Sequence, residues 1–178
     1  RKTNALLEGH FVLYSGLHSS KYIQCAKLLS YPSKATEICK SLALKIKKKF
    51  KKIDLILAPA MGGIIIGYEI GRILNKETIF CERVKGKFTL RRGFEIKKGS
   101  KVLIIEDVIT TGKSSMECVK LIKKSKAKLV GFASIIDRST QKSLKIKSKI
   151  VSHLKINVPV YKKNQIPFDL KSVPITTP

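Results

Sequence analysis

Acidic residues are scarce in this chain. Its 178 residues contain 12 Asp and Glu against 37 Lys and Arg, which gives a formal net charge of +25. A surface of this charge attracts anions such as nucleic acid, an acidic membrane face or phosphorylated small molecules, and it excludes a general cation-binding role. Arginine, which specific readers of nucleic-acid bases use for bidentate contacts, is also rare, with six copies against 31 lysines. Aromatic residues for base stacking make up only 7%, so the composition gives nucleic acid little support as a partner.

Cysteine and histidine are too few and too scattered to indicate a metal site. No two of the four cysteines form a CxxC pair, and the three histidines lie far apart in sequence. We therefore expect free thiols in a reducing compartment, without a zinc site or a disulfide framework. No apolar run approaches the length of a membrane span, and the sequence carries no secretory signal. The expectation is a cytoplasmic protein with no membrane partner.

Apolar patterns along the chain alternate between those of helices and those of strands. This alternation predicts an α/β fold, in which helices flank a mainly parallel sheet within a single domain over residues 1–178. Helices are expected over residues 2–9, from Pro32 to about 50, after Gly62 and over 114–125. Strands are expected twice within 10–24 and over 53–58, 78–81, 101–105, 129–136 and 149–156, with a hairpin-like excursion over 83–93.

The segment that follows the clearest buried strand carries the strongest chemical signal. Glu106 and Asp107 are the only adjacent acidic pair in the chain, and they come directly after the apolar run over 101–105. Burying such a pair is costly unless it meets a partner. The sequence from Thr110 to Ser114 then opens a helix, where backbone N–H groups, hydroxyls and the helix dipole can hold a phosphate. Carboxylates for ribose hydroxyls and a phosphate cradle a few residues apart suit a sugar phosphate.

Three commoner motifs fit this part of the chain less well. An ordinary N-cap would account for the Ser and Thr residues over 110–115 but not for the acidic pair. A P-loop requires a glycine where this chain has Asp107. A dinucleotide fingerprint requires GxGxxG after the first buried strand, where this chain has Pro59-Ala60-Met61-Gly62-Gly63.

Four segments of the chain resemble those of a known family. The signature VLIIEDVITTGKS resembles the phosphoribosyl diphosphate (PRPP) motif of the type I phosphoribosyltransferases. The stretch GHFVLYSGLHSSKYIQ is similar to the N-terminal segment on the orotate side of orotate phosphoribosyltransferases. APAMGGIIIGYEIGR resembles their pyrophosphate loop and helix, and ERVKGKFTLRRGF resembles the flexible lid of a short-loop bacterial branch.

The resemblance implies a fold and an activity. The fold is that of type I phosphoribosyltransferases, with a core over about 33–140 and a small hood formed by about 1–30 and the C-terminal tail. The activity is that of a pentosyltransferase. Orotate and PRPP give orotidine 5′-monophosphate and pyrophosphate in UMP biosynthesis, with Mg²⁺ as cofactor. Because this family holds Mg²⁺ mainly through PRPP, no metal-ligating residue is assigned.

The resemblance also implies roles for individual residues. Asp107 is a catalytic residue that holds the ribose hydroxyls together with Glu106, while Thr110 and Arg138 contact orotate. The PRPP-binding set consists of Arg83, Glu106, Asp107, Val108, Ile109, Thr110, Thr111, Gly112, Lys113 and Ser114.

The basic loop over 83–93 is implied to be a lid that closes over the neighbouring subunit of a homodimer. Within this loop, Lys85 and Lys87 are candidate catalytic residues. The candidates for neutralising pyrophosphate are Arg83, Lys85, Lys87, Arg91 and Arg92.

Two alternative functions remain open at this point. One is a phosphoribosyltransferase for a purine or another base, and the other is a non-catalytic PRPP-binding regulator that binds nucleic acid. The chain also departs from better-known members of the family. Met61-Gly62 replaces an aromatic–Lys pair, Tyr14 replaces a lysine, and the lid lacks a histidine, for which His18 is a candidate substitute. For Arg138 the alternative to orotate binding is a surface ion pair with Asp137.

Overall fold

The computed structural model describes residues 5–13, 16–140 and 144–177, and its chain divides into two compact units. The core unit is the continuous segment Pro32–Ile156, and the terminal unit combines Arg1–Tyr31 with Asn157–Pro178. The core unit extends past residue 140 because β8 (Ile150–Lys155) pairs with β7 (Lys128–Asp137).

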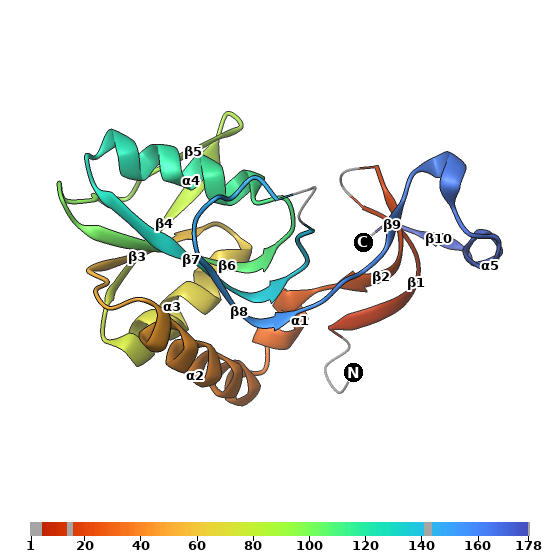
Figure 1. Cartoon of the computed structure of the whole chain (residues 1–178), viewed down its shortest axis with the longest axis horizontal. Helices are drawn as coiled ribbons and strands as arrows, with labels where there is room; N and C mark the ends of the chain where they lie inside the picture. The colour runs from red at the N-terminus through yellow and green to blue at the C-terminus, as the bar shows by residue number, and fades with distance from the viewer. Residues whose placement is uncertain (1–4, 14–15, 141–143, 178) are drawn as a thin grey trace. The chain divides into compact units, whose positions relative to one another are not determined.

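A six-stranded sheet forms the centre of the core unit (Figure 1). Its order is β5-β4-β3-β6-β7-β8, and every neighbouring pair is parallel except β4–β5. The remaining strands are β3 (Leu55–Pro59), β4 (Glu77–Val84), β5 (Lys87–Thr89) and β6 (Lys101–Ile109). β3 is buried throughout, as are Val102 to Ile105 of β6, which is the pattern of strands covered on both faces. The mainly parallel α/β sheet predicted from the sequence is confirmed.

Helices cover both faces of this sheet (Figure 1). α2 (Pro32–Lys49) and α3 (Gly62–Leu74) lie on one face, and α4 (Lys113–Lys124) lies on the other. Glycines spaced four apart on α3 (Gly63, Gly67 and Gly71) allow close packing, since a Cβ at Gly67 would lie 2.8 Å from the Cβ of Ala58 in β3. Any larger side chain there would push the helix away from the sheet.

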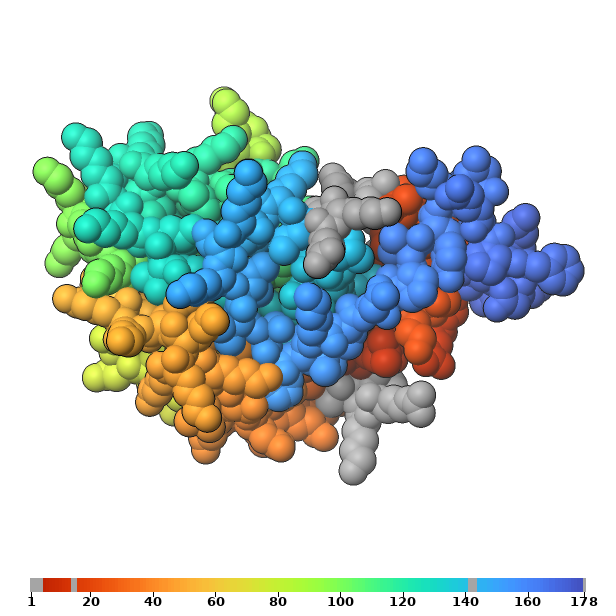
Figure 2. Space-filling model, in the orientation of Figure 1, coloured from red at the N-terminus to blue at the C-terminus, as the bar shows by residue number. Residues whose placement is uncertain are grey.

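The amphipathic pattern of α2 separates its apolar side from its lysines. Leu42, Ala43 and Ile46 are buried, whereas Lys45 and Lys47 to Lys49 are exposed. The outer face of α2 forms part of the surface that Figure 2 shows in orange. The lysine run therefore forms a solvated helix face, and these lysines are not part of the candidate site.

A small sheet in the order β10-β1-β2-β9 forms the terminal unit. Its strands are β1 (Leu6–Val12), β2 (His18–Ile23), β9 (Val160–Tyr161) and β10 (Ile175–Thr176). Short helices complete it: α1 (Cys25–Leu29), η1 (Lys163–Gln165) and α5 (Phe168–Lys171).

The helix predicted over residues 2–9 is wrong in its described part, because Leu6 to Gly9 belong to β1. β1 gains hydrogen bonds from β2 and from β10, and this pairing overrides the local helical preference.

All four cysteines are free, as predicted, and all are buried; the Sγ atoms of Cys81 and Cys118 lie 3.4 Å apart in the core unit. Among the residues that the structure describes, no helix is both long enough and apolar enough to cross a membrane.

Candidate active site

The candidate site lies at the carboxyl edge of the core sheet. β3, β6 and β7 are neighbouring parallel strands, so their carboxyl ends meet at one edge, where ligands bind in open α/β sheets. Ile109 pairs in register with Asp137, and the N–H of Arg138 donates a 2.8 Å hydrogen bond to the carbonyl of Ile109. The end of the signature strand and the Asp137-Arg138 pair are therefore adjacent.

Strand alternation places the two acidic side chains on opposite faces of β6. Glu106 faces α4 and is 8% exposed, and Ser115 in the first turn of that helix donates a hydrogen bond to its Oε1. Burial raises the pKa of Glu106 to about 7, while the bond from Ser115 opposes this rise. The ionised form of Glu106 therefore depends on its hydrogen-bond donors.

Asp107 faces α3 and is only partly buried. Its Oδ1 accepts a 2.8 Å hydrogen bond from the N–H of Val108, and its carboxylate lies over Gly62 at the start of α3. Burial raises the pKa of Asp107 as well. This carboxylate is thus held at the sheet edge with part of its surface open to a ligand.

The loop from Thr110 to Ser114 turns the chain from β6 into α4. Gly112 caps the helix with a φ of +72°, a left-handed conformation that favours glycine. The N-cap residue Gly112 makes no side-chain cap bond, but the Oγ1 of Thr111 accepts a 3.3 Å hydrogen bond from the N–H of Lys113, the first residue of the helix. Thr110, Thr111 and Lys113 are exposed. The exposed hydroxyls at the positive end of a twelve-residue helix form a cradle suited to an anion.

Other predicted members of the binding set differ in what they offer. Ile109 is 1% exposed and packs in the hydrophobic core, so only its backbone is available to a ligand. Val108 and Ser114 are partly buried, and Arg138 is partly buried beside the loop. The carboxylate of Asp137 accepts a 2.8 Å hydrogen bond from the N–H of Ser139 and lies 3.9 Å from the Nζ of Lys155.

The predicted lid is a hairpin formed by β4 and β5, which turns at Lys85 and Gly86. Lys85 and Lys87 are exposed, and in the described part of the chain neither forms an ion pair. Arg91 and Arg92 instead lie 3.4 Å and 3.3 Å from the Glu82 carboxylate.

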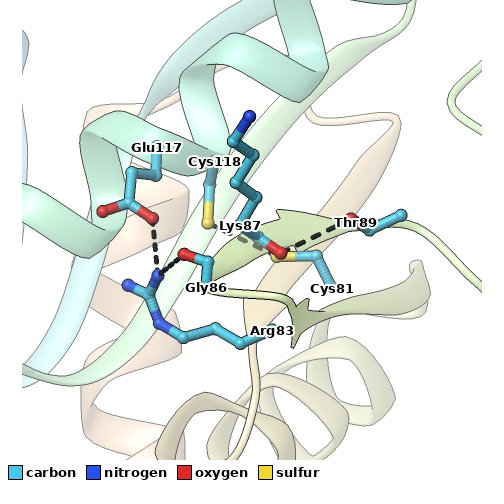
Figure 3. A network of polar contacts seen from close by, with 7 residues as sticks. All are labelled: Cys81, Arg83, Gly86, Lys87, Thr89, Glu117 and Cys118. Atoms are coloured by element: carbon cyan, nitrogen blue, oxygen red, sulfur yellow. Dashed lines mark hydrogen bonds and ion pairs between the residues drawn. The ribbon is translucent and has the colours of Figure 1, made fainter.

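Arg83 is engaged within the protein, as Figure 3 shows. Its guanidinium contacts the Glu117 carboxylate of α4 at 2.9 Å and donates to the carbonyl of Gly86 at 2.8 Å. It also stacks on the Phe88 ring, 4.1 Å from the ring centroid. These contacts link the lid to the helix that begins at the cradle. Both polar contacts use Nη1 of Arg83, and this side chain is exposed, as are those of Lys85 and Lys87.

Three residues of the site are not evident from the sequence. Local pattern marks Ser115 only as a helix-cap residue and Gly62 only as part of a turn, and it gives Glu117 no role. The partners of these residues lie between 9 and 45 positions away in sequence. No local pattern identifies such pairs, although a serine in the first helical turn after an acidic strand end is a signal worth testing.

His18 is a buried residue of β2 rather than part of an exposed turn. Its Nδ1 lies 2.7 Å from the Nε2 of His10, and both rings are almost fully buried in the terminal unit. Tyr14, the other departure noted in the N-terminal segment, lies outside the described residues.

The fold and the cradle define the class of this protein. Residues 32–170 match the family described as the phosphoribosyl transferase domain. Among solved structures, orotate phosphoribosyltransferase from Aeropyrum pernix is similar, with a TM-score of 0.73 and 21% identity over 87% of this chain and 90% of that one. Adenine phosphoribosyltransferase from Saccharomyces cerevisiae has a TM-score of 0.65 at 19% identity, over 75% and 86% of the two chains. At such identities these likenesses show the fold alone, and they confirm the predicted type I phosphoribosyltransferase fold.

Curated relatives narrow the class. Orotate phosphoribosyltransferase from Erythrobacter litoralis is 42% identical over 100% of this chain and 92% of its own length. The enzyme of the same name from Parvibaculum lavamentivorans is 44% identical over 99% and 91%. The chain therefore belongs to the orotate phosphoribosyltransferase family.

Proposed function

We propose that this protein transfers the 5-phosphoribosyl group of PRPP to orotate, giving orotidine 5′-monophosphate and pyrophosphate in UMP biosynthesis. The observation that carries the proposal is the acidic pair Glu106-Asp107, followed at the same sheet edge by the Thr110–Ser114 cradle. The family of the chain supports orotate as the base.

Each part of PRPP has a matching group in the proposed site. The carboxylates of Glu106 and Asp107 accept hydrogen bonds from the ribose hydroxyls, and the 110–114 loop holds the 5′-phosphate. Because the Ile109 side chain is buried, that residue contributes only through its backbone. Thr110 opens this loop and Arg138 lies beside it; both are proposed to bind orotate, whose carboxylate suits a guanidinium.

The chemistry of the transfer requires positioning and charge stabilisation. Loss of pyrophosphate leaves an oxocarbenium-like ribose, so the protein needs to align orotate and stabilise the departing negative charge. Lys85 and Lys87 are exposed on the lid and are proposed to neutralise pyrophosphate, and Arg83, whose side chain is also exposed, can join them.

We propose that Mg²⁺ enters as part of the PRPP complex, held by oxygens of PRPP itself. Mg²⁺ in phosphate-transferring sites is bound largely through substrate phosphates and water rather than by an all-protein cage. The donor set fits this mode, since the described residues contain no group of three His, Cys, Asp or Glu side chains able to hold a metal. When bound, Mg²⁺ neutralises part of the diphosphate charge.

A homodimer is proposed as the working form. Met61, Ile65 and Tyr68 follow one another at helical spacing along α3 and are 83%, 51% and 66% exposed. An apolar stripe of this kind is suited to a second copy of the chain, whose lid could then reach the neighbouring site. Sedimentation equilibrium of the wild type and of Tyr68→Lys checks this, because the charged variant should shift the protein toward the monomer. The free, buried cysteines support the further proposal of a cytoplasmic location.

Base specificity tests the proposal directly. Consumption of PRPP is measured with Mg²⁺ and orotate, uracil, adenine or xanthine in parallel. We expect turnover with orotate and at most a small fraction of it with the other bases. Turnover with adenine or xanthine alone would replace orotate by a purine. Binding of RNA or DNA at physiological salt without any PRPP turnover would instead indicate a regulator.

A further inference from the structure

Ser115 has an unusual role for a serine in the first turn of a helix. A serine that caps a helix precedes its first turn, whereas Ser115 is the third residue of α4, whose cap residue is Gly112. The Ser115 hydroxyl instead donates to the Oε1 of Glu106, nine residues earlier in the chain. Both side chains are buried, with Ser115 0% and Glu106 8% exposed, so this bond is protected from water. The geometry therefore joins the start of the cradle helix to one of the two carboxylates.

The direction of this bond matters for the chemistry. An ionised carboxylate only accepts hydrogen bonds, whereas a protonated one also donates. A bond from Ser115 to one oxygen restricts rotation of the carboxylate plane and leaves Oε2 as the oxygen that Ser115 does not engage. Two neighbouring ribose hydroxyls require acceptors at fixed positions, so an unrestrained carboxylate would bind them less well.

The charged and titratable groups around Glu106 do not make Ser115 redundant. Burial and the neighbouring Asp107 on β6 both favour the neutral form of Glu106, while Arg83 on β4 opposes them through its charge. On α4, Glu117 adds negative charge, and the Cys81 contact together with burial keeps the Cys118 thiol protonated by raising its pKa. Within the described residues, the hydroxyl of Ser115 is the side-chain donor whose hydrogen bond lowers the pKa of Glu106 against the rise to about 7.

We propose that Ser115 is a positioning residue, whose hydroxyl holds Glu106 in the orientation and ionised form that accept hydrogen bonds from the sugar hydroxyls of a phosphoribosyl substrate. The inference rests on the proposed function, since it assumes that Glu106 binds those hydroxyls. Removal of the hydroxyl should weaken PRPP binding most where Glu106 becomes protonated.

A second serine provides a matched control. Ser134 on β7 pairs in register with Glu106 and is also 0% exposed, so both serines are buried neighbours of the same carboxylate. Within the described residues, however, the Ser134 hydroxyl has no hydrogen-bond partner. Ser134→Ala therefore removes a buried hydroxyl from the same region without removing a bond to Glu106.

The experiment compares the pH profiles of kcat/KM for PRPP in wild type, Ser115→Ala, Ser115→Thr and Ser134→Ala. For Ser115→Ala we expect KM for PRPP to rise about tenfold near neutral pH and the acid limb to move up by about one pH unit. Ser115→Thr should restore the wild-type limb, and Ser134→Ala should superimpose on the wild type. A Ser115→Ala limb unchanged from the wild type, or one moved equally by Ser134→Ala, would overturn the inference.

Further variants keep the test decisive if Ser115→Ala folds poorly. Ser115→Thr and Ser115→Val have the same shape, so a difference in PRPP affinity between them isolates the hydroxyl. In a Glu106→Gln background, Ser115→Ala should add little further loss, because its partner can no longer ionise. Additive losses would contradict the proposed link. Absence of orotate turnover in the wild type would overturn the proposed function itself, a result distinct from an unaltered Ser115→Ala profile.

Discussion

The carboxylate of Asp107 occupies the space that a side chain at Gly62 would need. A Cβ built on Gly62 would lie 2.5 Å from the Oδ2 and 2.7 Å from the Oδ1 of Asp107. Real Cβ atoms do not approach other atoms this closely, so any other residue at position 62 must displace the carboxylate. The two segments that meet here are the start of α3 and the end of β6. Gly62 is thus needed for the close approach of the start of α3 to the Asp107 carboxylate.

Gly62→Ala should therefore impair catalysis more than folding. Because the added methyl pushes Asp107 from its position, we expect kcat/KM for PRPP to fall about tenfold or more. Gly67→Ala on the same helix is the matched control, since its Cβ would meet Ala58 at 2.8 Å, away from the carboxylate. That control should lower Tm while KM for PRPP stays near the wild-type value. If Gly62→Ala lowered only Tm and Gly67→Ala impaired catalysis with PRPP, Gly62 would have no role in placing the Asp107 carboxylate.

Asp107→Asn tests the acidic pair itself. Hydrogen bonds to charged groups are worth about 1.5–3 kcal/mol, so loss of the charge should reduce turnover about a hundredfold. The carboxylate is only partly buried, and we expect circular dichroism and Tm to remain close to those of the wild type. Asp169→Asn, a change at an exposed residue of α5, serves as the control. Near-normal turnover in Asp107→Asn would remove this residue from the mechanism.

Glu106 should make the stability of the protein depend on pH. Its pKa is raised by burial from the ordinary 4.5 to about 7, so the folded protein binds this proton more tightly than the unfolded chain. The stability associated with the neutral group is therefore present below about pH 4.5 and is lost as the pH rises through about 7. The loss amounts to about 3 kcal/mol.

Glu106→Gln removes this titration while keeping a hydrogen-bond acceptor for Ser115. Its Tm should exceed that of the wild type at pH 8, and the difference should shrink toward pH 4.5, even though activity falls. Thermal denaturation across this range gives the measurement, with the exposed Glu37→Gln as control. A difference in Tm that is constant with pH would show that Glu106 does not cause the pH dependence of stability.

The lid lysines should act through charge. Lys85→Ala and Lys87→Ala are each expected to lower kcat/KM for PRPP about tenfold, because each removes a cation available to pyrophosphate. The effect should diminish as salt screens the remaining attraction. Lys97→Ala, at another exposed lysine before β6, is the control and should behave like the wild type. Equal losses in all three variants would point to the general charge of the protein instead.

Mixing two impaired variants shows whether each lid covers its own site or that of the neighbouring subunit. If the lid serves the neighbouring subunit, a heterodimer of Asp107→Asn and Lys87→Ala contains one site with both intact residues. Random exchange should then restore activity to about one quarter of wild type, since half of the dimers have one good site of two. If activity stays at the level of the separate variants after subunit exchange, each lid covers its own site.

Local sequence pattern was sufficient for most of the core unit. The helical spacing of Ile38, Leu42 and Ile46 predicted α2, and the continuous apolar runs predicted β3 and β6. The short runs in the N-terminal segment were less informative, and the described part of the helix expected over residues 2–9 belongs largely to β1. Its partner β10 lies more than 160 residues away, at a distance where no local preference could signal the pairing.

The candidate site was likewise predictable from the sequence only in part. The acidic pair and the loop that follows it are contiguous, so their chemistry was evident from their order. The contacts that set their geometry are not contiguous. Ser115 beside Glu106 and Gly62 beside Asp107 arise only when helices pack on opposite faces of β6. The pairing of Arg83 with Glu117 likewise depends on how α4 lies beside the hairpin.

The sheet of the terminal unit is assembled from both ends of the chain, since β1 pairs with β10 and β2 with β9. This has a consequence during translation. The core unit is one continuous segment, so its strands and helices can form while later residues are still inside the ribosome. β1 and β2 leave the ribosome before the core unit, but their sheet must wait for β9 and β10, which are made after it, a connection of high contact order. A nascent chain can therefore have its catalytic edge folded while its earliest strands still await their partners.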